Sequence, residues 1–103
     1  MAGFENRLAC VIAADGTIAR GYLIDWCRFE SPNSYTIGWE VPLQGEAKTN
    51  FAGTIGSATD EPTPPGLITV GLGHAPNEMQ VHTFDPTGKP AARSFHIACF
   101  RDR

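Results

Sequence analysis

Two histidines in the last two predicted strands are the residues of this chain whose chemistry is most adaptable near neutral pH. His82 lies in the segment 79–84 and His96 in the segment 94–100, with a loop rich in Pro and Gly between them. If the two segments pair as an antiparallel hairpin, His82 and His96 face each other with their Cβ atoms about 5.5 Å apart. Such a pair predicts either a shared metal ion or a pH-sensitive contact between subunits.

The hairpin face that carries the histidines also carries Phe84 and Phe100, and the resulting surface is too apolar for a monomer. We therefore predict an interface between copies of the chain, with His82, Phe84, His96 and Phe100 as its candidate residues. No metal site is assigned, because His74 falls in a loop and no third ligand has a recognisable spacing. The opposite face is expected to line the core with Met79, Val81, Thr83, Phe95, Ile97 and Cys99.

A second candidate site is centred on Trp26. Pairing of residues 22–29 with residues 35–41 places Trp26 over Gly38, on an outer face that also holds Arg28 and Glu40. An exposed indole beside charged side chains predicts a ligand site that stacks on a sugar ring, with Trp26, Arg28 and Glu40 as its candidate residues. The simpler interpretation is that Trp26 covers the gap above Gly38 or lies in a contact between subunits.

Patterns that would indicate catalysis are weak. Cys99 and His96 are three residues apart in one predicted strand, so their side chains point to opposite faces and cannot form a nucleophile–base pair. The segment Gly71-Leu72-Gly73 lacks the rest of a phosphate-binding loop. We therefore expect no enzyme, and we assign no catalytic residue and no cofactor.

The three cysteines, Cys10, Cys27 and Cys99, cannot all pair within one chain. Free, buried thiols are the simpler expectation. A disulfide between Cys10 and Cys99 stays open as an alternative if the first and last strands are neighbours.

Length and composition exclude several classes of protein. With 103 residues the chain is expected to fold as one domain, residues 1–103. Charged residues make up 18% of the chain, below the roughly 25% of an average soluble domain, and a weakly charged surface suits a subunit interface. The arginines are scattered, so no basic stripe indicates nucleic acid, and no apolar run is long enough to span a membrane.

Short segments of alternating polarity, separated by turn residues, must position these side chains. Asp15-Gly16 predicts a tight hairpin, and Asp85-Pro86-Thr87-Gly88 predicts a turn followed by a bulge. This spacing predicts an all-β, single-domain antiparallel β-sandwich of about seven strands, jelly-roll or Greek-key-like. The predicted strands are residues 7–13, 18–29 (bent at Gly21), 35–41, 49–55, 67–72, 79–84 and 94–100.

Two stretches resemble a known kind of small β-domain. They are Ala13-Ala14-Asp15-Gly16-Thr17-Ile18-Ala19-Arg20-Gly21 and Val81-x-Thr83-Phe84-Asp85-x-x-Gly88-x-Pro90-Ala91-x-Arg93-x-Phe95-His96-x-Ala98. The domain they resemble recurs in bacterial surface and collagen-like proteins and in phage tail-fibre-like proteins, often at a C-terminus. The resemblance covers most of the chain and implies a β-sandwich that trimerises.

These observations lead to an expected function. We expect a non-enzymatic, oligomerising structural or interaction domain, with a homotrimer favoured, as in the head of a surface or fibre-like assembly. The alternative is a carbohydrate-binding, lectin-like adhesin module, and a glycan or a second protein is the partner to be tested. No signal peptide pattern is convincing, so we expect a chain that stays in the cytoplasm, leaves by a non-classical route or belongs to a virion.

Overall fold

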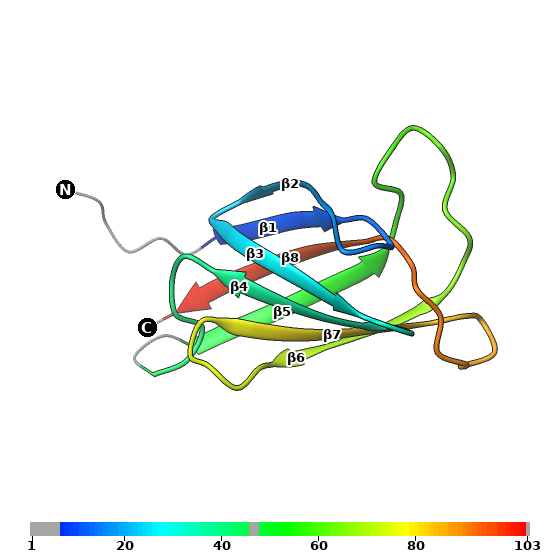
Figure 1. Ribbon diagram of the computed structural model, residues 1–103. Helices are drawn as coiled ribbons and strands as arrows, with labels where there is room; N and C mark the ends of the chain where they lie inside the picture. The colour runs from blue at the N-terminus through cyan, green and yellow to red at the C-terminus, as the bar shows by residue number, and fades with distance from the viewer. Residues whose placement is uncertain (1–6, 46–47, 103) are drawn as a thin grey trace.

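Two antiparallel sheets of four strands form the fold, as the computed structural model shows for residues 7–45 and 48–102 (Figure 1). The strands are β1 (Arg7–Ile12), β2 (Ile18–Tyr22), β3 (Ile24–Glu30), β4 (Ser34–Trp39), β5 (Lys48–Ile55), β6 (Leu67–Leu72), β7 (Glu78–Phe84) and β8 (Phe95–Asp102). The first sheet has the order β2-β1-β8-β5 and the second the order β3-β4-β7-β6. The predicted all-β sandwich is therefore confirmed, with eight strands in place of about seven.

Neighbours in each sheet are often distant in the sequence. β1 lies beside β8, β8 beside β5, and β4 beside β7, so crossing connections join the two sheets and the order is not a simple meander.

Within the part of the chain that the structure describes, no helix is long and apolar enough to cross a membrane.

The additional strand arises because the predicted segment 18–29 is divided in two. The division lies at Leu23, whose backbone is left-handed with φ 67°, and not at Gly21 as the sequence suggested. β2 belongs to the first sheet and β3 to the second, so Leu23 turns the chain from one sheet into the other. Gly21 is instead a position with no room for a side chain, because a Cβ atom there would lie 2.5 Å from Cγ2 of Ile24.

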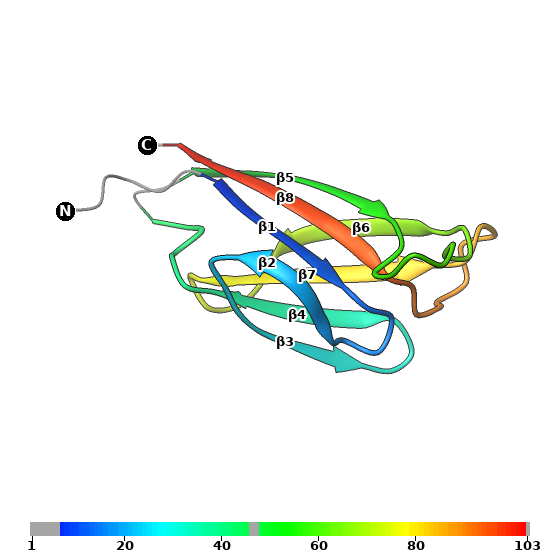
Figure 2. The ribbon, with the colours of Figure 1, turned by 90° about the horizontal axis from the view of Figure 1, so that it is seen from above.

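The last two strands do not form a hairpin, and this prediction is wrong. β7 lies between β4 and β6 in the second sheet, whereas β8 lies between β1 and β5 in the first; Figure 2 shows them in different layers. The predicted turn itself is present, with Gly88 at φ 91° and its N–H donating to the carbonyl of Asp85 at 3.0 Å. After an isolated bridge between Phe84 and Pro90, the chain crosses to the other sheet, because both edges of β7 are already occupied.

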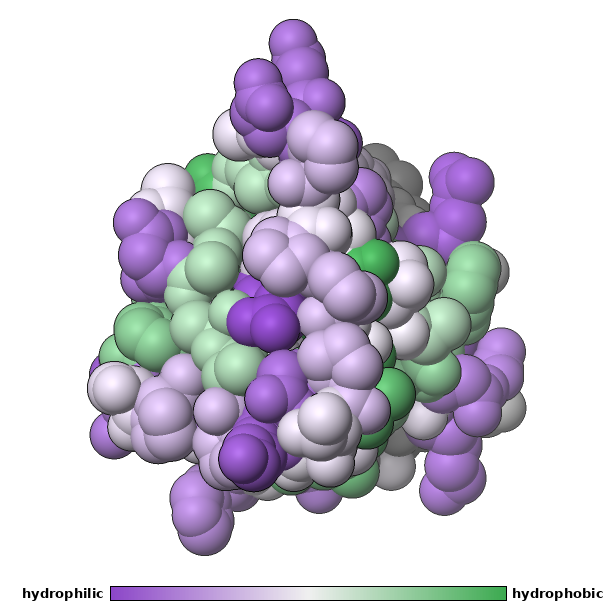
Figure 3. All heavy atoms as spheres, turned by 90° about the vertical axis from the view of Figure 1, so that its right-hand side faces the viewer, coloured by the Kyte–Doolittle hydropathy of each residue, from purple (hydrophilic) through white to green (hydrophobic). Residues whose placement is uncertain are grey.

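A long loop, residues 56–66, connects β5 to β6 and projects from one end of the sandwich, with its hydrophilic tip at the top of Figure 3. Hydrogen bonds connect this loop to Arg93 and Ser94, which directly precede β8. The Ser94 hydroxyl donates to the carbonyl of Gly56 at 2.7 Å, and Nε of Arg93 donates to the carbonyl of Pro65 at 2.9 Å. The loop therefore joins the two sheets at this end.

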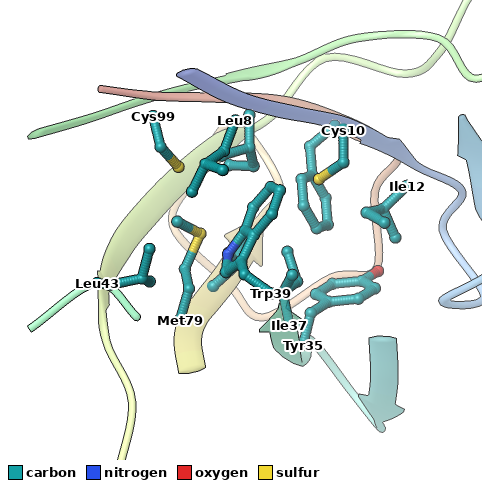
Figure 4. Close-up of a cluster of buried hydrophobic side chains, with 12 residues drawn as sticks. Leu8, Cys10, Ile12, Tyr35, Ile37, Trp39, Leu43, Met79 and Cys99 are labelled. Atoms are coloured by element: carbon teal, nitrogen blue, oxygen red, sulfur yellow. The ribbon is translucent and has the colours of Figure 1, made fainter. Parts of the chain in front are cut away.

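The core lies between the sheets and is built from inward-facing residues of β1, β4, β7 and β8. Trp39 lies at the centre of the cluster drawn in Figure 4, close to Leu8 and Met79. Farther along, the ring of Tyr35 meets Phe95 edge to face with centroids 4.8 Å apart. The six residues predicted to line the core on the last two strands are all at most 3% exposed, so that part of the prediction is confirmed: Met79, Val81, Thr83, Phe95, Ile97 and Cys99.

The three cysteines are free; Cys10 and Cys99 are buried as expected, whereas Cys27 is only partly buried. Cys10 is opposite Ile97 in the β1–β8 ladder and Cys99 is opposite Leu8, so the two thiols are diagonal neighbours on the inward face. Burial raises the pKa of Cys99 to about 12 and that of Cys27 to about 11. The pKa of Cys10 is also raised, first by burial and then by the nearby thiol of Cys99.

Candidate functional site

The outer faces of the two sheets differ in chemistry, and each carries part of the predicted site. On the first sheet, Ala9, Ala98 and Ala52 lie in register across β1, β8 and β5. Tyr22 continues this row on β2 and is 53% exposed, while Phe100, two residues along β8, is 52% exposed. The face thus has a floor of small side chains beside two large, exposed aromatic ones.

The outer face of the first sheet is hollowed along this row of alanines. One shallow cavity of about 590 Å³ lies over the alanine row, and a second of about 540 Å³ extends it toward Phe100. Both are lined by Ala9, Tyr22 and Ala98, so they form one continuous surface, which we call the alanine groove. The lining of this groove is predominantly apolar.

His96 lines the alanine groove but also has a structural contact. Its Nε2 atom is 2.8 Å from the carbonyl oxygen of Ser57, and its ring covers Gly56, where a Cβ atom would lie 2.8 Å from Cδ2. His82 lies between Ser34 and Thr69 on the outer face of the other sheet. The opposed histidine pair expected from the sequence is therefore not formed, because its two members belong to different sheets.

The predicted aromatic pair is divided in the same way. Phe100 lies on the first sheet at the alanine groove, whereas Phe84 ends β7 on the second sheet, opposite Leu67 and bridged to Pro90. His82, Phe84, His96 and Phe100 consequently do not share one surface. Of these four, His96 and Phe100 lie together on the apolar face.

The second sheet places Trp26 over Gly38, as predicted. A Cβ atom on Gly38 would lie 2.2 Å from both Cε2 and Nε1 of the indole, so the ring covers the glycine. The guanidinium carbon of Arg28 lies over the same ring, 5.6 Å from its centroid, and Nε of Arg28 is 4.0 Å from a carboxylate oxygen of Glu30. The indole thus contacts both the backbone of β4 and a neighbouring cation.

A polar groove of about 360 Å³ lies beside this cluster on the same face. Arg28 lines it, whereas Trp26 is adjacent and Glu40 lies outside it. Most of its residues could not be predicted from the sequence to lie together, because they meet only through the β4–β7 pairing. We call this surface the polar groove, and its lining residues are Arg28, Glu30, Thr36, Leu72, Gly73, His74, Glu78 and Gln80.

Among residues 7–45 and 48–102, no group of three or more His, Cys, Asp or Glu side chains is arranged to hold a metal ion. Comparison of the chain with protein-family models, with curated proteins and with solved structures gives no match. The resemblance to domains of surface and fibre-like proteins therefore stays a prediction. The alanine groove and the polar groove are therefore the two candidate binding surfaces of the described residues.

Proposed function

We propose that this chain is a non-enzymatic association module that packs against other copies of itself through the alanine groove. The observation that carries the proposal is the half-exposed aromatic pair, Tyr22 and Phe100, beside a continuous floor of alanines. Contiguous apolar surface of this kind is uncommon on a monomer and is typical of a protein interface.

A second copy fits this face because the face carries both parts of a complementary contact. Phe100 projects from it, and the alanine row offers a depression without bulky side chains. In a closed ring of copies, such as a trimer, each contact joins two different parts of the surface, so a projecting ring of one subunit can fill the depression of the next. Polar residues such as Arg20 and Thr54 border the apolar centre, which matches the usual core and rim of an interface.

The resemblance noted in the sequence favours a trimer as the assembly. It also favours a role in the head of a surface or fibre-like structure. The low proportion of charged residues, 18% of the chain, is consistent with a surface that is partly covered by neighbours.

The replacement Ala98→Lys is expected to convert the assembly to monomers. Ala98 lies at the centre of the groove, and a lysine there would have to lose its hydration when a second copy packs against it. Size-exclusion chromatography with light scattering should show an oligomer for the unchanged protein and a monomer for the variant. Circular dichroism should show the same strand content in both, because the side chain points outward.

The matched control is Thr69→Lys, which adds the same charge at an exposed outward position on β6 of the other sheet. This variant should stay oligomeric. A monomeric unchanged protein over the whole concentration range would overturn the proposal. An Ala98→Lys variant that associates as well as the Thr69→Lys variant would overturn it too.

A further inference from the structure

β6 is an edge strand of the second sheet and has an uncharged sequence. It pairs with β7 on one side, and no strand among the described residues pairs with its other side; Figure 1 shows it at the bottom of the sandwich. Its six residues, Leu67–Leu72, include no charged residue and no proline, and its ladder with β7 has no register shift. A regular, uncharged edge strand of this kind is a template for pairing with another strand.

The other three edge strands carry features that oppose such pairing. A register shift interrupts the ladder that β2 forms with β1, and another interrupts the ladder that β3 forms with β4. β3 also carries Asp25, Arg28 and Glu30, and β5 begins with Lys48. Bulges and charged side chains are the usual means by which proteins keep sheet edges from pairing. Among these four edges, β6 is therefore the one best suited to accept a further strand.

The free hydrogen-bonding groups of β6 belong to alternate residues. The N–H of Gly73 donates to the carbonyl of Glu78 at 2.8 Å, and the β6–β7 register repeats this hydrogen-bonded alignment at every second residue back along β6. The odd-numbered residues of β6 thus direct their N–H and C=O groups to β7. The even-numbered residues direct theirs to the free edge, and these residues are Ile68, Val70 and Leu72.

The outer face of the same strand carries a projecting side chain and a gap. Leu67, Thr69 and Gly71 share this face. Leu67 is 51% exposed, whereas a Cβ atom on Gly71 would meet no atom within 4 Å. Thr69 lies midway between them and is exposed. An antiparallel copy of the strand that is centred on Thr69 therefore aligns Leu67 of each copy with Gly71 of the other.

We propose that β6 pairs antiparallel with β6 of a second copy, across a two-fold axis at Thr69. The N–H and C=O groups of Ile68 in one copy then bond to those of Val70 in the other. Each Leu67 fills the open space above Gly71 of its partner strand. Because β6 is uncharged, no like charges oppose each other, and the two sheets of four strands become one sheet of eight.

This contact is separate from the alanine groove, which lies on the other sheet. A contact made by one six-residue strand is small, and contacts below about 1,200 Å² are typically weak, so we expect a dissociation constant of about 1 mM. The Ala98→Lys variant is accordingly a monomer in chromatography at micromolar concentration. In an assembly held by the alanine groove, several β6 edges act together, so that the weak contact joins neighbouring assemblies.

Disulfide trapping at about 1 mM protein in the Ala98→Lys background tests the pairing. Thr69→Cys places two thiols at the two-fold axis, where the Cα atoms of a non-hydrogen-bonded pair lie about 4.5 Å apart, a separation that a disulfide spans. Under mild oxidation its linked dimer should form at least about tenfold faster than that of Glu30→Cys, because pairing raises the effective concentration of the thiols. Glu30 is the matched control, since its side chain is 62% exposed on β3, the opposite edge of the same sheet.

The register is tested by mixing Leu67→Cys chains with Gly71→Cys chains. The mixture should form a linked dimer, whereas neither variant should link by itself, because each position is aligned with the other one. A Leu67→Cys variant that links alone as fast as the mixture would overturn the proposed register.

Equal rates for Thr69→Cys and Glu30→Cys would overturn the self-pairing of β6. If no cross-link forms but an uncharged extended peptide shifts the NMR amide signals of Ile68, Val70 and Leu72, the edge binds a strand of a different protein and self-pairing is likewise overturned. The result does not depend on the alanine groove. If the unchanged protein is a monomer in chromatography, the proposal for that groove fails, while the Thr69→Cys cross-link should still form.

Discussion

Replacement of Phe95 by alanine is expected to lower the free energy of unfolding by about 3–5 kcal/mol. Phe95 has no exposed surface, and its ring meets Tyr35 edge to face with centroids 4.8 Å apart. It also lies between Ile12 and Ile55 in the first sheet, so its removal opens a cavity where both sheets meet. A domain of this size is stabilised by about 5–15 kcal/mol in total, so the variant should unfold at a much lower urea concentration.

Phe100→Ala is the control for this prediction, because it removes the same side chain from the same strand on the opposite face. Phe100 is half exposed, and its loss should change the stability of the monomer by no more than about 1 kcal/mol. Urea unfolding at a protein concentration that keeps the chain monomeric measures both values. Equal losses at the two positions would mean that Phe95 is not part of the core.

Alkaline solution is expected to destabilise the fold through its buried thiols. The pKa of Cys99 is raised by burial from its ordinary value of 9.0 to about 12, and the pKa of Cys10 is raised by burial and by Cys99. Below pH 9 these thiols are protonated in both the folded and the unfolded chain, so they do not affect the pH dependence. Above it, the unfolded chain releases protons that the folded chain retains, and the free energy of unfolding falls as the pH rises.

The size of this effect is about 2 kcal/mol for each thiol between about pH 8 and about pH 10.5, or about 4 kcal/mol for the pair. Urea unfolding at the two pH values measures it. The double variant Cys10→Ala/Cys99→Ala separates the thiols from other groups that titrate in the same range. That variant should start less stable but lose about 4 kcal/mol less than the unchanged protein on the same pH change. Identical losses would show that the thiols ionise equally in both states.

Strand positions are readily predicted from this sequence because its local signals agree with one another. Around Asp15 the predicted hairpin is present: Gly16 has φ 93°, and the carboxylate of Asp15 accepts the N–H of Thr17 at 3.0 Å. The alternation on β7 and β8 likewise predicts which side chains point inward, since that property needs only the period of the strand. The position of Trp26 over Gly38 follows because β3 and β4 are joined by a short turn.

The sheet to which each strand belongs could not be predicted in this way, because it depends on pairing between strands that are far apart in the sequence. The turn at Asp85–Gly88 looks like a hairpin turn and folds as one, yet the following strand pairs with β1 and β5. Nothing local to that turn shows that β4 and β6 already occupy both edges of β7. The polar groove was missed for the same reason, since Thr36 and Gln80 meet only through the β4–β7 ladder.

The pairing of β1 with β8 determines how the domain responds to tension. Arg7 opens β1 and lies opposite Phe100 near the end of β8, so the two strands have these ends on the same side of the sheet. A force that pulls these ends apart acts along the ladder hydrogen bonds, which run perpendicular to the strands. The bonds then break one after another, from Arg7–Phe100 toward Ile12–Phe95, and do not share the load. Pulled in this direction, the sandwich should unzip at low force, whereas a load applied along the strands would have to shear the whole ladder at once.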